Sequence, residues 1–235
     1  MVPSPSPTTP HSHRSATPPR WQRRPESRPE EILDAAQRAF GEFGYARTKL
    51  EDVARLAGVC KGTLYLYFES KEFLFRAMVR AKVVTALAEA EAFARSYPGP
   101  AEELLRHLVT RMYQRLRQEP MVRITRLVQA ELGNFPELAQ FYFEEVILRA
   151  RRLIEQILRR GTDTGEFRTL AHGFAARGLA SLMVHTAQVQ CLFHHLDPDA
   201  LSDEQALEGL IDLYLNGVLA RPMGPLAVPA APPRP

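Results

Sequence analysis

The chain has only two cysteines, Cys60 and Cys191, among its 235 residues. They lie far apart and belong to no spaced metal motif, which excludes a disulfide framework and favours a reducing compartment. No apolar run reaches the roughly 18 residues that a membrane-spanning helix needs. The N-terminus also lacks the apolar core of a signal peptide. We therefore expect a cytoplasmic protein with no membrane segment.

The net charge is also small, because 30 lysines and arginines nearly balance 27 aspartates and glutamates and leave a net charge of +3. The basic excess lies in the N-terminal tail, so any affinity of the remaining chain for nucleic acid must come from local placement. Residues 1–27, rich in proline and arginine, and residues 221–235, rich in proline, are expected to be disordered. The tail arginines could enter a minor groove, or the tail could simply be a solubilising leader.

Between the tails the pattern is helical throughout, with no alternating strand signature and no internal repeat. Ser27 and Glu30 predict a capping box at the start of a first helix, which Gly44 ends. Thr48 and Glu51 predict a second capping box, and a glycine turn follows that helix. A third short helix is expected over about residues 60–67. Three helices at this spacing are typical of a helix-turn-helix.

Residues 57–72 read AGVCKGTLYLYFESKE, and Ser70 in this run is expected to cap a fourth helix. Together with the apolar pattern of residues 32–74, this run resembles the DNA-binding domain of the bacterial tetracycline-repressor (TetR) family. Two residues depart from the usual pattern of that family. Cys60 stands where a serine commonly caps the recognition helix, and Leu66 stands where a polar or aromatic residue is common.

The resemblance implies an all-α homodimer of about nine helices that binds a double-stranded, palindromic DNA operator in the bacterial cytoplasm. The helix-turn-helix domain would span residues 28–74, and an effector-binding and dimerisation domain would span residues 75–220. The N-terminal part of a recognition helix meets base edges, while neighbouring groups hold phosphates. The expected DNA contacts are Thr48, Lys49, Lys61, Gly62, Thr63, Tyr65, Tyr67 and Lys71. Thr48 is expected at the exposed start of the second helix.

The second half of the chain carries an aromatic and methionine-rich set that suits an apolar pocket for an unknown small-molecule effector. The pocket candidates are Met112, Tyr113, Leu127, Phe141 and Tyr142, although an ordinary core position is the simpler reading of each one taken singly. A leucine-rich stripe on the last helix is expected to form the dimer interface through Leu207, Leu210, Ile211 and Tyr214. An arginine run over residues 149–160 is interpreted as a solvated helix face.

Three functional classes compete on this sequence. The preferred class is a DNA-binding transcriptional regulator, expected to be a repressor, which a small molecule releases from DNA. The second is a helical DNA-binding protein without an effector, whose second domain would be filled with side chains. The third is an enzyme with a metal at Cys191 and His195, one helical turn apart. No further ligand is in register with that pair, so we expect no metal, no cofactor and no catalytic residues.

Overall fold

The structure is a computed structural model that describes residues 28–219. Both tails that were expected to be disordered, and Ser27 of the first capping box, lie outside the described residues. Within that range the chain folds into helices, and its single β-bridge joins Phe167 to Leu219. The predicted all-α class is therefore confirmed.

The helices are α1 (Arg28–Phe43), α2 (Leu50–Leu56), α3 (Lys61–Tyr67), α4 (Lys71–Val79), α5 (Thr85–Ser96), α6 (Ala101–Leu116), α7 (Glu119–Glu131), α8 (Pro136–Tyr142), α9 (Arg149–Asp163), α10 (His172–Phe193) and α11 (Asp203–Val218). Two π-helical segments, η2 (Arg80–Val84) and η4 (Phe143–Leu148), and a short 3₁₀ segment, η3 (Leu132–Asn134), complete the list. Since η2 joins α4 to α5 and η4 joins α8 to α9 without a break, the described residues form nine continuous helical runs. This agrees with the predicted number.

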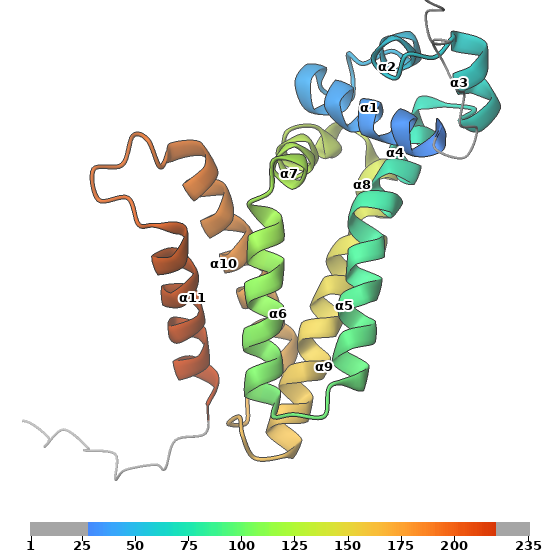
Figure 1. Cartoon of the computed structure of the whole chain (residues 1–235). Helices are drawn as coiled ribbons and strands as arrows, with labels where there is room; N and C mark the ends of the chain where they lie inside the picture. The colour runs from blue at the N-terminus through green and yellow to red at the C-terminus, as the bar shows by residue number, and fades with distance from the viewer. Residues whose placement is uncertain (1–27, 220–235) are drawn as a thin grey trace, which may run out of the picture.

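Helices α1–α4 form a small head at one end of the molecule (Figure 1). Its core is built around Ile32, Phe40, Leu64 and Phe75, all of which are almost completely buried. Gly58, with φ of +64°, makes the turn between α2 and α3 in a conformation that other residues rarely adopt. The Ser70 hydroxyl accepts the amide of Phe73 at 3.0 Å and caps α4, as predicted.

The remaining helices form a body in which α5, α6 and α9 run alongside one another, with α10 and α11 farther out (Figure 1). A second core joins α6, α9, α10 and α11 through side chains such as Leu104, Ile154, Leu179 and Leu215. Helix α7 lies beneath the head and packs on α1. The expected boundary at residues 74 and 75 falls inside α4, so the head and the body share one continuous helix.

Candidate nucleic-acid interface and cavity

Helix α3 is held by two side chains and exposes most of the others. Leu64 is fully buried and Phe68, just after the helix, is nearly so. Tyr65, Leu66 and Tyr67 are 42, 84 and 39% exposed. A short helix that offers two tyrosines and a leucine to solvent is unusual unless a partner covers it. The exposed face of α3 is therefore the candidate interface.

The start of α3 carries the side chains predicted to read bases. The Lys61 ammonium lies 2.5 Å from the Glu51 carboxylate and 5.7 Å from the centre of the Tyr65 ring. Both charged groups are largely exposed, so a phosphate or a base edge can compete for the lysine at small cost. A Cβ added at Gly62 would meet nothing within 4 Å, which leaves open space where DNA backbone could approach.

Cys60 replaces the usual capping residue at the start of α3 without making a cap. Its side chain makes no N-cap hydrogen bond, and its Sγ lies 3.0 Å from the Thr63 hydroxyl. The Thr63 hydroxyl first, and then the nearby backbone amides, lower the pKa of the Cys60 thiol. Thr63 is thereby engaged by its own helix turn.

The structure contradicts the predicted exposure and capping role of Thr48. This residue is buried, and its hydroxyl lies 2.6 Å from the carbonyl oxygen of Gly44 and 3.1 Å from that of Ala39. The residue that precedes α2 is instead Lys49, whose amide donates to the Asp52 carboxylate at 3.3 Å. The Lys49 side chain is exposed, as a DNA contact requires.

The Lys71 side chain is likewise engaged in hydrogen bonds within the head. Its ammonium donates to the carbonyl oxygens of Tyr45 at 2.8 Å and Ala46 at 3.1 Å, and it lies over the Tyr45 ring. Partial burial lowers the pKa of Lys71. An ammonium has three donors, so one remains for a phosphate. The first role of Lys71 is to hold the turn between α1 and α2.

The body contains a cavity of about 410 Å³ that is partly open to solvent. Its lining residues come mainly from α5, α6, α7 and α10 and from both π segments, with one residue each from α8 and α9. Its walls are mostly apolar, as in Leu87, Met121, Val146 and Met183. A volume in the range of about 300–1,000 Å³ with such walls is typical of small-molecule sites. The filled second domain that an effector-free protein would require is therefore not what the described residues form.

Only part of the predicted pocket set lines this cavity. Met112 and Tyr142 do, whereas Tyr113, Leu127 and Phe141 belong to the packed cores. Burial raises the pKa of Tyr142 to about 12, so its phenol stays neutral. The sequence interpretation missed the small residues that leave the space open and the arginines in the wall. These are Ala86, Ala90, Ala180, Arg115 and Arg151.

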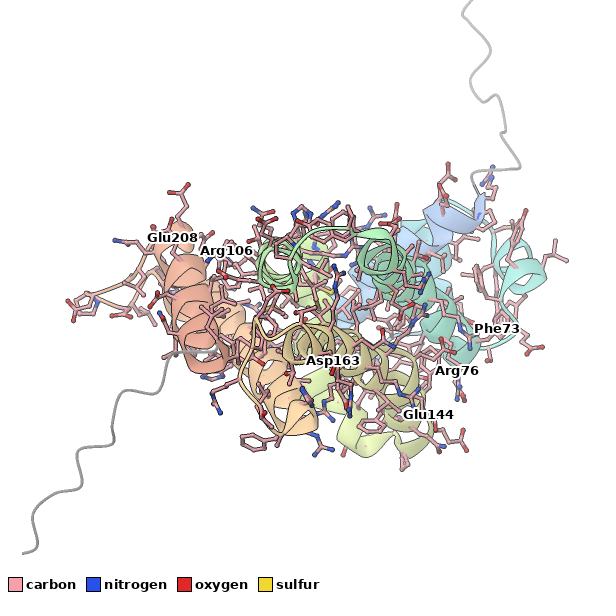
Figure 2. All side chains as sticks on the ribbon, turned by 90° about the horizontal axis from the view of Figure 1, so that it is seen from below. Phe73, Arg76, Arg106, Glu144, Asp163 and Glu208 are labelled. Atoms are coloured by element: carbon pink, nitrogen blue, oxygen red, sulfur yellow. The ribbon has the colours of Figure 1, made fainter. Side chains whose placement is uncertain are left out.

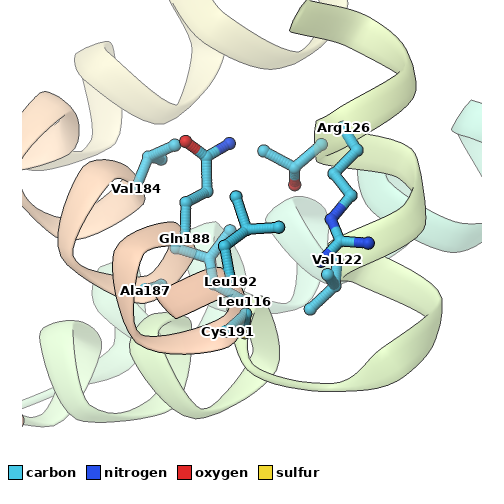
Figure 3. Close-up of a pocket in the computed structure, with 9 residues that line it drawn as sticks. Leu116, Val122, Arg126, Val184, Ala187, Gln188, Cys191 and Leu192 are labelled. Atoms are coloured by element: carbon cyan, nitrogen blue, oxygen red, sulfur yellow. The ribbon is translucent and has the colours of Figure 1, made fainter. Parts of the chain in front are cut away.

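A smaller pocket of about 10 Å³ adjoins the cavity between α7 and α10 (Figure 3). The two share Leu116, Thr125, Val184 and Gln188 as lining residues. In Figure 3, Gln188 of α10 and Arg126 of α7 extend into the space between these helices. Since the smaller pocket admits little more than one water molecule, the larger cavity is the candidate ligand site.

Most of the predicted dimer stripe packs inside the protomer, and only Leu207 and Tyr214 keep partly exposed side chains. Leu210 and Ile211 are buried in the second core, Leu207 packs against it, and the Tyr214 hydroxyl donates to the Ala175 carbonyl at 3.0 Å. The outer face of α11 instead exposes Leu213 and Glu208, the latter at the edge of the molecule in Figure 2.

The arginine run of residues 149–160 is also more engaged than expected. Arg149 makes a bidentate contact with Glu91 at 2.5 and 2.7 Å, and Arg160 donates to the Tyr97 carbonyl at 2.9 Å.

Within residues 28–219, no three histidine, cysteine or acidic side chains gather as metal ligands. No helix in the same range combines the length and apolarity needed to cross a bilayer.

Two family models match the chain over the head and over most of the body. Residues 32–78 match the model of bacterial regulatory proteins of the tetR family, and residues 103–217 match that of the AefR-like transcriptional repressor C-terminal domain. The chain belongs to the TetR family. Both matches fall on the two regions that the sequence resemblance had distinguished.

Individual relatives agree with this assignment. The transcriptional regulator RutR of Escherichia coli K12 is 30% identical over 139 residues, 59% of this chain and 54% of RutR. The alignment thus spans about half of that curated relative. NalD of Pseudomonas aeruginosa, described as the secondary repressor of the MexAB-OprM multidrug efflux pump, is 26% identical with a TM-score of 0.65. That match covers 83% of this chain and 98% of NalD.

The fold is also shared with FadR of Bacillus subtilis, solved in complex with stearoyl-CoA. The TM-score is 0.65 at 23% identity, and the match covers 77% of this chain and 97% of FadR. At this identity the likeness concerns the fold alone. The TetR-type arrangement of a helix-turn-helix head on a helical body is therefore supported both by the sequence models and by solved structures.

Proposed function

We propose that this chain is a dimeric TetR-type transcriptional regulator, acting as a repressor in the bacterial cytoplasm, which a small molecule releases from a palindromic operator. The observation that carries the proposal is the exposed face of α3, with Lys61, Gly62, Tyr65 and Tyr67, on a head of the TetR family. In a helix-turn-helix this helix enters the major groove. NalD and RutR, a repressor and a transcriptional regulator by name, support the same role.

The proposed DNA contacts divide by what each side chain is free to do. Lys61 and Gly62 at the start of α3 read base edges, and Tyr65 and Tyr67 contact the sugar–phosphate backbone. Lys49 holds a phosphate from the start of α2. Thr63 and Lys71 are engaged by the protein, so they contribute less than their positions alone would suggest.

Effector control is proposed to act through the cavity in the body. Helix α5, which continues from α4 of the head, lines the cavity with Ala86, Leu87 and Ala90. A ligand can shift the regulator only by binding one conformation better than the other. A molecule that favours a different angle between head and body would change the spacing of the two recognition helices in a dimer.

The dimer is proposed to form through the outer faces of α10 and α11. Phe174, Phe193 and Leu213 on these helices are 78, 51 and 66% exposed, which is costly for large apolar side chains in a monomer. A two-fold pairing would place two copies of α3 about one helical turn of DNA apart, roughly 34 Å.

Selection of the operator from random duplexes, followed by fluorescence anisotropy, tests the DNA-binding proposal. Loss of a base contact costs about 1–3 kcal/mol and relaxes specificity, while loss of a phosphate contact lowers the salt slope by about 1. We expect the Lys61→Ala/Tyr65→Ala variant to lose most specific affinity. The control is Arg106→Ala, which removes an exposed arginine on α6 (Figure 2). Equal operator affinity of the wild type and the double variant would show that α3 is not the reading element.

A further inference from the structure

The charges that line the body cavity are all of one sign. Arg115 of α6, Arg151 of α9 and His185 of α10 contribute basic side chains to its wall. None of the described residues that line it is aspartate or glutamate. Arg115 is exposed at the mouth of the cavity and Arg151 is half-buried. Two guanidinium groups without a carboxylate give this part of the wall a positive potential.

Neither arginine is neutralised by another part of the described chain. Arg115 uses one of its five donors on the Lys82 carbonyl at 2.6 Å, and Arg151 lies 5.9 Å from the centre of the Phe143 ring. No ion pair is found for either residue within residues 28–219. Arg149 differs, since Glu91 binds it with both oxygens. The two cavity arginines thus keep donors for an external anion.

The wall also holds an amide donor without a partner. The Gln188 oxygen accepts the Gln129 amide at 3.0 Å, which orients the Gln188 side chain. Its own Nε2 is buried and has no hydrogen-bond partner among the described residues. An unmet buried donor is costly, and an acceptor on a bound ligand would remove that cost. The wall therefore presents guanidinium and amide donors toward acceptor atoms.

The rest of the wall is apolar and suits a hydrocarbon chain. Valine, leucine, methionine and alanine side chains from α5, α6, α7, η4 and α10 supply it. From these observations we propose that the cavity binds an amphiphile with one anionic head, a carboxylate or a phosphate monoester, and an apolar tail. The head contacts Arg115 and Arg151, and the tail lies against the apolar wall. This inference rests on the proposed effector function and specifies the chemistry of the effector.

Calorimetric titration of the full chain with four ten-carbon probes tests the head group. The probes are decanoate, decyl phosphate, 1-decanol and decylamine, which share one tail and differ in charge. We expect either anion to bind at least tenfold more tightly than the alcohol and the amine, and the better anion identifies the head. Along a carboxylate series, each added CH₂ should raise affinity roughly fourfold until the cavity is full.

Matched variants assign the selectivity to the arginines. Replacing both, Arg115→Gln/Arg151→Gln, should weaken anion binding by about 10–100-fold, as expected for charge-assisted hydrogen bonds. Binding of 1-decanol should not change, which shows that the variant still folds and keeps its tail site. Arg106→Gln, outside the cavity, serves as the control. Equal affinity for all four probes, or anion binding that survives the double substitution, would overturn the proposal.

Operator binding in the presence of the probes separates this inference from the proposed function. If decanoate binds through the arginines but leaves operator affinity unchanged, the ligand chemistry is right and effector control by this ligand is wrong. If the operator binds and no anion is preferred, the ligand chemistry is wrong and the DNA-binding proposal is unaffected.

Discussion

The sharpest test of how the head is attached to the body is a substitution at Gly44. This glycine follows α1 with φ of +80°, and a Cβ placed on it would overlap the Oε1 of Glu131 in α7. The other carboxylate oxygen of Glu131 accepts the Ala46 amide at 2.7 Å. Gly44→Ala therefore strains the backbone and also displaces the carboxylate that joins α7 to the turn after α1.

The two costs can be estimated separately. A non-glycine residue in the left-handed region costs roughly 1–2 kcal/mol. The bond from Ala46 to a charged acceptor contributes about 1–2 kcal/mol once its exposure to solvent is allowed for. Gly44→Ala should thus lower the free energy of unfolding by about 2–4 kcal/mol in the wild type, but by only about 1–2 kcal/mol in Glu131→Ala. The difference is the coupling between the two positions.

Urea unfolding of the wild type, both single variants and the double variant measures this coupling. Gly58→Ala is the matched control, because φ at Gly58 is +64° and an added Cβ would meet nothing within 4 Å. Its cost should be the same with and without Glu131. A coupling between Gly44 and Glu131 below about 0.5 kcal/mol would refute the steric argument.

Three further outcomes follow from buried polar groups. Thr48→Val removes a buried hydroxyl whose one proton lies between two carbonyl oxygens, and should cost about 1–3 kcal/mol in urea unfolding, whereas Thr48→Ser should cost clearly less. Tyr113→Phe removes a buried hydroxyl that has no partner among the described residues, so the Tm should rise by about 2–4 °C. Burial raises the pKa of Tyr142 from 10.0 to about 12, so the unfolded chain ionises first as pH rises. The stabilisation contributed by Tyr142 should therefore fall by about 2–3 kcal/mol between pH 10 and 12, so the wild type should lose about that much more stability than Tyr142→Phe over this range.

Local sequence rules predicted the head well, with one instructive error. The Ser70 cap and the Gly58 turn depend on one or two neighbouring residues, and both are found where the pattern indicates. Thr48 and Glu51 match the capping-box pattern equally well. The Thr48 hydroxyl, however, bonds carbonyls at the end of α1, and Asp52 interacts with the Lys49 amide instead. A hydroxyl between two helices can accept from an amide at the start of the second helix or donate to a carbonyl at the end of the first. The sequence alone does not decide between these two hydrogen bonds.

The body was predicted less well. Hydrophobic periodicity predicts which side chains are buried, but not whether another helix of the same chain, a second protomer or a ligand buries them. The stripe of Leu210 and Ile211 is apolar since it packs on α6 and α10 of its own chain. Phe141 and Met112 carry similar sequence signals, yet one belongs to the core and the other lines the cavity. Arg151 is one of several arginines in residues 149–160, and nothing in the sequence distinguishes it from the others. Its position in the wall depends on how α9 meets α10, which no local pattern contains.

Helix α7 is bonded to the head at both of its ends and lines the cavity between them. At its start, the Gln37 amide of α1 donates to the Pro120 carbonyl at 2.7 Å, and at its end Glu131 accepts the Ala46 amide. Thr125 and Val128, between these points, face the cavity. A shift of α7 must therefore break these bonds or carry α1 and the turn before α2 with it. The other connection, α4 to α5, passes through the π segment η2, where a helix bends more easily. For the proposed effector control, this geometry favours α7 over α5 as the element that would transmit a change at the cavity to the head.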